Sequence, residues 1–237
     1  MSGFFNRSYK IHHDLDLVSI HIPKTAGTSF RNFLKLNYGE ENAARFDINV
    51  TTKRIDLENR EFKDKRLPSH IRVIHGHFYY SDLIRYIRLK DIPLITWLRD
   101  PAERVISNYY YLAGRLKEEL EEEKKGLNIL AKMQRSLIEY ARNEISRNRI
   151  SKFLEGSHPE NYKFIGIYEY YNEDIHDLAE ILGIQDVKIF QHNITGEKAD
   201  VDPEVLRQIR ELNEEDYTWY RKALELRAQR RSKTSEP

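Results

Sequence analysis

The sequence predicts an α/β protein in which a doubly wound, mostly parallel sheet is flanked by helices. Short apolar runs rich in β-branched residues alternate with amphipathic segments whose apolar residues fall at helical spacing. The sequence shows no internal repeat. An alternation of this kind is typical of parallel strands joined by helical crossovers. The runs that predict strands occupy residues 17–22, 71–75, 94–98 and 163–168, with a further short run at 187–190.

The length and composition suit one globular domain. The chain has 237 residues, of which 40% are hydrophobic and 11% aromatic, and this is enough for a sizeable core. We expect residues 1–237 to form a single domain, with a polar lead-in at 1–16 and a frayed basic tail at 226–237. Residues 12–16 contain two histidines and two aspartates, but no further ligands follow at helical or strand spacing, so we predict solvated side chains and no metal site.

Charge and cysteine content exclude several classes of protein. The 39 basic and 38 acidic residues nearly cancel, so the overall field gives no reason to expect binding to nucleic acid or to a membrane surface. The chain contains no cysteine, which excludes a disulfide scaffold, a thiolate metal site and a catalytic cysteine, and fits a reducing compartment. No apolar stretch approaches the ~20 residues that span a bilayer, and the first residues lack a signal-peptide core. We therefore expect a cytoplasmic protein.

Residues 17–38, LVSIHIPKTAGTSFRNFLKLNY, predict a strand, a short loop and a helix. The first turn of a helix has backbone N–H groups without intrahelical partners and the positive end of the helix dipole, so this unit suits a phosphate-like anion. Lys24 would add a mobile charge and Gly27 a close backbone approach. Thr28 and Ser29 would add hydroxyl donors. Lys24 precedes the glycine, so this is not a Walker A loop, and an ordinary turn with a surface lysine is the alternative.

Two histidines follow the second predicted strand. Residues 39–70 before it are polar and charged, and they predict a loop with one short helix or strand whose basic residues border a cleft or face solvent. The strand at 71–75 then ends in His75-Gly76-His77, on the same edge of the sheet as the Lys24 loop. Imidazole supplies a base with a pKa near 7. The alternative is that both histidines close the strand by bonding to the backbone.

Residues 92–111, IPLITWLRDPAERVISNYYY, repeat the plan of strand and helix, with Pro at a first helical position. Arg99 at the end of the strand and Ser107 about two turns into the helix could both point to the crevice above the sheet. An arginine with a hydroxyl is a good phosphate receptor. Asn108 and Tyr111 continue on nearby faces of this helix. The alternative is a local ion pair between Arg99 and Asp100, with a solvated Ser107.

The remaining chain carries weaker signals. A charged stretch at 115–126 predicts a solvated helix or an excursion, and 127–154 predicts at least one amphipathic helix. The strand at 163–168 leads to a helix that stops at Gly183. Asp202 and Pro203 predict the start of the closing helical region.

Together, HIPKTAGTSF and LRDPAERVISNYYY resemble the nucleotide-binding signature of sulfotransferases that use 3′-phosphoadenosine 5′-phosphosulfate (PAPS). The first resembles the loop that holds the 5′-phosphosulfate, and the second the element that holds the 3′-phosphate. Both motifs, and the HGHF between them, are similar to the carbohydrate branch that includes heparan sulfate 2-O- and 6-O-sulfotransferases. The resemblance covers residues 17–111 well and the rest loosely.

This resemblance implies a P-loop-like fold and transfer of the sulfuryl group of PAPS to an acceptor hydroxyl, on a saccharide by family analogy, without a metal. His77 would be the base, with His75 orienting or assisting it, and Lys24 would stabilise the leaving group. A loop at 191–200 would close over the nucleotide, as in many relatives. The PAPS-binding residues implied are Lys24, Thr25, Ala26, Gly27, Thr28, Ser29, Arg99, Ser107, Asn193 and Thr195.

Two other classes of function stay open on the sequence alone. An atypical P-loop kinase would need Mg²⁺ and an aspartate at a strand end, for which Asp100 is the candidate. A noncatalytic module that binds a nucleotide or a glycan would keep the fold without the chemistry. The identity of the acceptor and the oligomeric state are not indicated by these residues.

Overall fold

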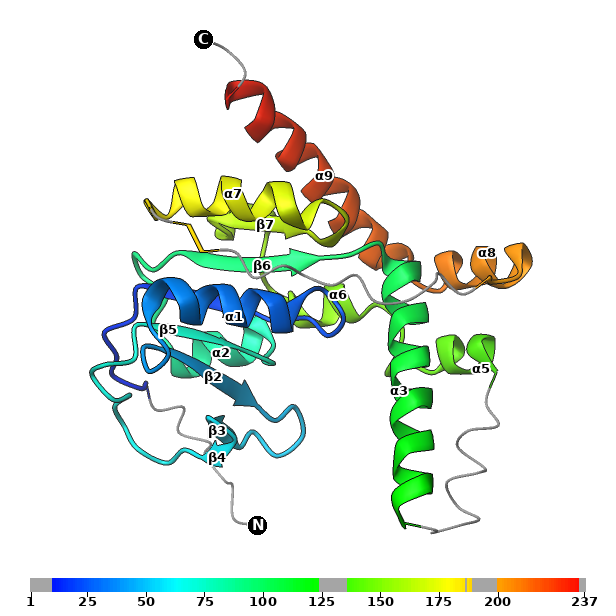
Figure 1. The fold of residues 1–237 in the computed structure, drawn as a ribbon, viewed down its shortest axis with the longest axis horizontal. Helices are drawn as coiled ribbons and strands as arrows, with labels where there is room; N and C mark the ends of the chain where they lie inside the picture. The colour runs from blue at the N-terminus through cyan, green and yellow to red at the C-terminus, as the bar shows by residue number, and fades with distance from the viewer. Residues whose placement is uncertain (1–9, 124–135, 186, 189–199, 235–237) are drawn as a thin grey trace, which may run out of the picture.

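A computed structural model describes residues 10–123, 136–185, 187–188 and 200–234. Within them, seven strands form one sheet in the order β4-β3-β2-β5-β1-β6-β7 (Figure 1). The five parallel strands are β1 (Leu17–Ile20), β2 (Ala43–Ile48), β5 (Val73–Gly76), β6 (Leu94–Leu98) and β7 (Phe164–Ile167). Two short antiparallel strands, β3 (Ile55–Leu57) and β4 (Arg60–Glu61), extend the β2 edge. The predicted mostly parallel sheet is therefore confirmed.

Helices cover both faces of the sheet. The face that Figure 1 presents to the viewer carries α1 (Gly27–Tyr38) and α7 (Tyr171–Ile181). The opposite face packs against α2 (Tyr80–Tyr86), α6 (Arg149–Phe153) and α9 (Glu214–Thr234). Successive strand residues point to opposite faces, so Leu17 packs with Phe30 of α1 while Val18 packs with Leu83 of α2. This two-sided burial is the physical basis of the continuous apolar strands in the sequence.

A third group of helices lies at the end of the sheet where the parallel strands terminate. It consists of α3 (Pro101–Glu123), α5 (Leu137–Arg142) and α8 (Pro203–Glu211), which share a small core of their own (Figure 1). Asp202 caps α8 by accepting from the N–H groups of Glu204 and Val205, as the sequence predicts. Two 3-10 turns, η1 (Pro159–Asn161) and η2 (Tyr168–Tyr170), flank β7. In the described part of the chain, no helix has the combination of length and apolar character that crossing a bilayer requires.

The prediction of a loop across residues 39–70 is wrong in its main feature. β2 is a full member of the parallel sheet and pairs with β5, and β3 and β4 follow it. The side chains of Ala44, Phe46 and Ile48 are buried, whereas Arg45 and Asp47 between them are half-buried. That period of two is a strand signal, and the two charged residues concealed it.

The described parts of the lead-in, from residue 10, and of the tail, as far as residue 234, differ from the prediction. In the lead-in, Ile11 and Leu15 are buried in the core, and His12 forms a parallel bridge with Arg66. The tail predicted to fray from 226 is part of α9, which continues as far as Thr234 because arginines of this helix pair with acidic residues of α7.

The segments beyond the second motif also differ in detail. α3 continues without a break as far as Glu123, past the start of the charged stretch. The described part of 127–154 contains two short helices, α5 and α6. Of the strand predicted at 187–190, residues 187–188 are not in a strand and the other two lie outside the described residues.

Candidate active site

The loop between β1 and α1 has an unusual backbone. Lys24 and Ala26 adopt left-handed conformations, with φ of 72° and 70°. Such conformations cost about 1–3 kcal/mol each in residues other than glycine, and they cluster at ligand sites. Ala26 is the N-cap of α1, and no side chain caps the helix. The first turn of α1 also contains no acidic residue, so its positive end is left uncompensated.

The residues of this loop that carry hydroxyl groups differ in whether they line the cavity described below, and Gly27 makes room for a neighbouring side chain. The Thr25 hydroxyl donates to the Ile22 carbonyl at 2.8 Å, and both Thr25 and Ser29 have buried side chains that do not line the cavity described below. Thr28, in contrast, is exposed and lines it. A Cβ atom on Gly27 would lie 1.8 Å from Nε2 of His21. The close approach that requires glycine here is therefore made by an imidazole of the protein itself.

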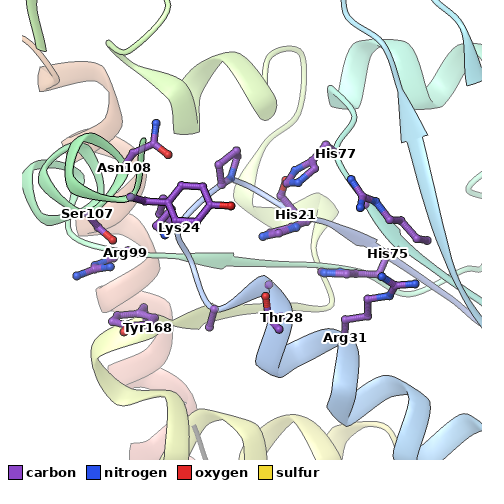
Figure 2. A pocket seen from close by; sticks show the side chains of 16 residues that line it. His21, Lys24, Thr28, Arg31, His75, His77, Arg99, Ser107, Asn108 and Tyr168 are labelled. Atoms are coloured by element: carbon purple, nitrogen blue, oxygen red, sulfur yellow. The ribbon is translucent and has the colours of Figure 1, made fainter. Parts of the chain in front are cut away.

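A cavity of about 540 Å³ opens above the carboxyl ends of the parallel strands (Figure 2). Figure 2 shows Lys24, Arg99 and Ser107 on one side of it and the histidines on the other. The predicted site residues that line it are Lys24, Ala26, Gly27, Thr28, His75, His77, Arg99 and Ser107. The other residues that line it are His21, Pro23, Arg31, Arg45, Gly76, Asn108, Tyr111 and Tyr168. Asn193 and Thr195 lie outside the described residues.

The lining of this cavity is strongly basic. It includes Lys24, Arg31, Arg45 and Arg99 and no carboxylate. Glu58 pairs with Arg31 at 2.8 Å from outside the lining, whereas no carboxylate pairs with Lys24 in the described part of the chain. Burial and the charge of Arg99 lower the pKa of Lys24. Two cations that repel each other in this way favour an anionic ligand that lies between them.

Arg99 lies over the ring of Tyr168, with 4.4 Å between its Cζ atom and the ring centroid. Its acidic neighbour is Glu103, at 3.7 Å, and its buried Nε has no hydrogen-bond partner among the described residues. The alternative ion pair with Asp100 is wrong. The Asp100 carboxylate instead accepts from the Glu103 N–H at 3.0 Å and from the Tyr217 hydroxyl at 3.1 Å, outside the cavity lining. The arginine therefore keeps donors for a ligand.

His77 is held through one ring nitrogen. Its Nδ1 lies 2.9 Å from the backbone carbonyl oxygen of His21. A carbonyl can only accept, so Nδ1 carries the proton and Nε2 of the neutral ring is the basic atom. Burial is the largest cause of a lowered pKa at His77, which favours the neutral form. The geometry suits a general base that acts through Nε2.

His75 is placed differently. It is 5% exposed, and its Nδ1 lies 2.9 Å from the Ser19 hydroxyl. Burial, followed by the charge of His77, lowers its pKa to about 3. His75 is therefore neutral at physiological pH and has little access to solvent, so a supporting position suits it better than proton exchange.

Several residues of the cavity were not predicted, although some carried a signal. His21 and Tyr168 follow β1 and β7, at the same carboxyl edge that led to His75 and Arg99. The sequence does not point to Arg45, because the charged residues of its strand conceal the strand pattern. In the described part of the chain, no group of three or more His, Asp or Glu side chains is arranged to hold a metal ion.

Comparison with known proteins identifies the family. A family model described as "Sulfotransferase family" matches residues 7–223. The chain belongs to the sulfotransferase family. The resemblance drawn from the two motifs is thereby confirmed.

The relatives of this sulfotransferase-family protein are distant. Human and Pongo abelii heparan sulfate 2-O-sulfotransferase 1 are 30% identical to it over 105 residues, which is 42% of this chain and 30% of each relative. A sulfotransferase structure from Alicyclobacillus acidocaldarius is similar with a TM-score of 0.47 and 13% identity, covering 85% of this chain and 92% of that one. Mouse SULT7A1 complexed with PAP is similar with a TM-score of 0.42 and 14% identity, covering 86% of this chain and 66% of that one.

Proposed function

We propose that this protein transfers the sulfuryl group of PAPS to an acceptor hydroxyl. One observation carries the proposal: Lys24 and the Arg99–Ser107 pair, distant in sequence, line one basic cavity. Its volume of about 540 Å³ is typical of small-molecule sites. Membership of the sulfotransferase family supports the reaction class.

The two groups of residues would hold the two charged ends of the nucleotide. Lys24 and the backbone N–H groups at the start of α1 bind the 5′-phosphosulfate, because they combine a cation with an uncapped helix terminus. Arg99 and Ser107 bind the 3′-phosphate, which distinguishes PAPS from ATP. The Ser107 hydroxyl is suited to this because it lines the cavity together with Arg99.

His77 acts on the acceptor. Its Nε2 takes the proton of the acceptor hydroxyl while the acceptor oxygen forms a bond to sulfur. The bond between sulfur and the bridging oxygen breaks, and adenosine 3′,5′-bisphosphate leaves. Lys24 and the N–H groups of the loop stabilise the charge that builds on the bridging oxygen, an effect worth about 3–4 kcal/mol for one such donor. His75 remains neutral and supports the stack of rings beside the base.

We propose a saccharide as the acceptor. Support comes from the curated relatives, which are named as heparan sulfate 2-O-sulfotransferases. The chain spans about 30% of the length of these relatives, so their acceptor is a guide to the class of compound to test.

A thermal-shift comparison tests nucleotide choice. Adenosine 3′,5′-bisphosphate should raise the melting temperature without Mg²⁺, because a ligand that binds only the folded state stabilises it by mass action. A response to ATP with Mg²⁺ instead would favour the kinase alternative. The structure already weakens that alternative, since Asp100 caps α3 instead of facing the cavity.

Incubation with labelled PAPS and a panel of saccharides then tests transfer. Label should move to a saccharide, and peptide and small-metabolite hydroxyls serve as the comparison. Binding of the bisphosphate without transfer to any acceptor in the panel would favour the noncatalytic alternative.

A further inference from the structure

Three imidazole rings form a stack beside the cavity, and the middle one has no role in the proposed reaction. The ring of His21 lies 4.2 Å from that of His77, with an angle of 26° between the planes, and 4.9 Å from that of His75, with an angle of 18°. Figure 2 shows His21 between the other two labelled histidines. One ring therefore restricts both histidines of the HGH segment.

The same ring reaches Gly27, at the end of the loop between β1 and α1. Its Nε2 and Cε1 atoms occupy the place where a Cβ atom of residue 27 would be, at 1.8 and 1.9 Å. Gly27 has no positive φ, so its backbone conformation does not require glycine. Glycine is required because a Cβ atom at this position would occupy the space of the His21 ring. This packing joins the first residue of α1 to the histidines at the end of β5.

His21 also holds His77 through its backbone. The carbonyl oxygen of His21 accepts from Nδ1 of His77 at 2.9 Å, and the N–H of His21 donates to the Gly76 carbonyl at 2.8 Å. The χ2 angle of histidine has broad preferences, so a hydrogen bond at one nitrogen leaves the plane of the ring free to tilt about it. Stacking on a flat neighbour removes that freedom.

We propose that His21 is a positioning residue for the base, His77. The imidazole of His21 fixes the plane of the His77 ring and keeps water away from that ring. Nε2 of His77 is thereby directed to the acceptor hydroxyl. This inference rests on the proposed role of His77. Removing the ring would misplace the base, and a misplacement of about 1 Å can cost about a hundredfold in rate.

The surroundings of His77 set the direction of the expected pH effect. Asp47 and Arg45 face it from β2, and Arg149 faces it from α6, and these charges stay in place when the side chain of His21 changes. His21 is itself held neutral, first by burial and then by the charges of His75 and His77. Loss of the His21 ring therefore acts on His77 by admitting water. Water favours the imidazolium, so the pKa of His77 should rise.

NMR titration of the imidazole protons measures this without an acceptor or a nucleotide. The chain has nine histidines, so a His77→Ala spectrum identifies the signal of His77. In the wild type, His77 should be the Nδ1–H tautomer and titrate below pH 6.5. In His21→Ala, its pKa should rise toward the ordinary value. In His21→Phe, which keeps a flat ring, its pKa should stay near that of the wild type.

Kinetics gives the second readout. In His21→Ala, kcat should fall about tenfold to a hundredfold with KM for PAPS within about twofold. The acidic limb of the pH profile should move to higher pH, because activity needs neutral His77. In His21→Ala, an unchanged pKa of His77 with only a lower melting temperature would show a structural role and overturn the proposal. The Nε2–H tautomer in the wild type would also overturn it.

Gly27→Ala provides a test in which the His21 side chain is kept. Gly27→Ala should displace the His21 ring and raise the pKa of His77 as His21→Ala does. The double variant should show no further rise, because the added methyl group then occupies the space that the ring has left. Independent, additive shifts would contradict the contact. A wild type that shows the expected tautomer but neither binds the bisphosphate nor transfers label would refute only the proposed function.

Discussion

At the scale of single residues, Lys24 combines a strained backbone with a charge that has no acidic partner in the described chain. Lys24→Ala should lower turnover at least a hundredfold, because the donor to the bridging oxygen is lost. Radiolabel transfer from PAPS measures this. Lys35→Ala is the matched control, since Lys35 lies in the last turn of α1, the helix that follows the Lys24 loop, and pairs with Glu40. Equal turnover in the two variants would remove Lys24 from the mechanism.

Substitution of Arg99 should weaken nucleotide binding more than it slows the chemical step. Arg99→Ala should raise the dissociation constant of adenosine 3′,5′-bisphosphate by about tenfold or more, because a charge-assisted contact to phosphate is lost. Titration calorimetry gives this constant directly. Arg85→Ala, an exposed arginine of α2 outside the cavity lining, should leave it unchanged. A constant that does not change in Arg99→Ala refutes the 3′-phosphate assignment.

Substitution of His77 should slow the chemical step without weakening nucleotide binding. His77→Ala should lower turnover at least a hundredfold and leave affinity for the bisphosphate near that of the wild type. On the proposed mechanism only neutral His77 accepts the proton, and burial lowers its pKa from the ordinary 6.5, so activity should rise with pH and reach half its maximum below pH 6.5. Full activity in the variant would transfer the role of base to another group.

Single residues were predictable where chemistry and chain position coincide. Lys24, Arg99 and His77 have side chains that suit anions or protons and lie just past predicted strands, Ser107 lies about two turns into the helix after one, and all four line one cavity. The inward turn of the Thr25 hydroxyl was not predictable, because it depends on a bond to the Ile22 carbonyl formed by the folded loop.

At the scale of elements, the contact between α7 and α9 explains why the basic end of the chain is helical. The Asp174 side chain is fully buried, accepts from the N–H of Ile167 at 2.8 Å and pairs with Arg227 at 2.7 Å. The pattern of the basic tail gave no sign of this, since pairing needs the neighbouring helix. Strand β6, in contrast, matches its predicted bounds, because its apolar run is buried on both faces.

This contact supports a prediction about stability. Arg227→Ala should lower the free energy of unfolding by about 3 kcal/mol, because it leaves a buried carboxylate with a weaker partner, Arg230, at 3.6 Å. Arg221→Ala on the same helix should change it by less than about 1 kcal/mol, because the pair of Arg221 with Glu214 is exposed. Urea unfolding compares the two. Similar losses would show that burial of Asp174 does not control the contact.

At the scale of the whole molecule, the neutral histidines make stability depend on pH. The pKa of His75 is about 3 in the folded state and near 6.5 when unfolded, so the unfolded chain binds more protons between these values. The free energy of unfolding should therefore be fully developed above pH 6.5 and decrease as the pH falls below it. His21 and His77 act in the same direction.

Unfolding in urea at pH 7.5, 6.5 and 5.5 measures this dependence. Buried carboxylates with raised pKa values, among them Asp174 and Asp216, act in the opposite direction at lower pH. A His75→Asn variant therefore isolates the histidine, and its stability should change less over this range than that of the wild type. Parallel curves for the two proteins would refute the assignment to His75.

The mostly parallel α/β architecture could be predicted from the alternation of apolar runs and amphipathic segments, whereas the β2 edge of the sheet could not. Strands such as β1 and β6 are apolar on both sides, so the sequence alone marks them. β2 carries Arg45 and Asp47, because this strand also supplies the site: Arg45 lines the cavity and Asp47 accepts from the N–H of His77. The strand pattern and the lining of the cavity therefore favour different residue types at these positions.

The central place of β1 has a consequence for how the protein is made. Leu17 pairs with Val73 and Val18 with Leu94, so β1 is synthesised before both of its neighbours and can pair only once they have left the ribosome. Parallel pairing over such separations is slow because large loops must close first. The loop between β1 and α1 should therefore take its final shape only after residue 98 has left the ribosome, and until then the exposed β1 run is a target for chaperones.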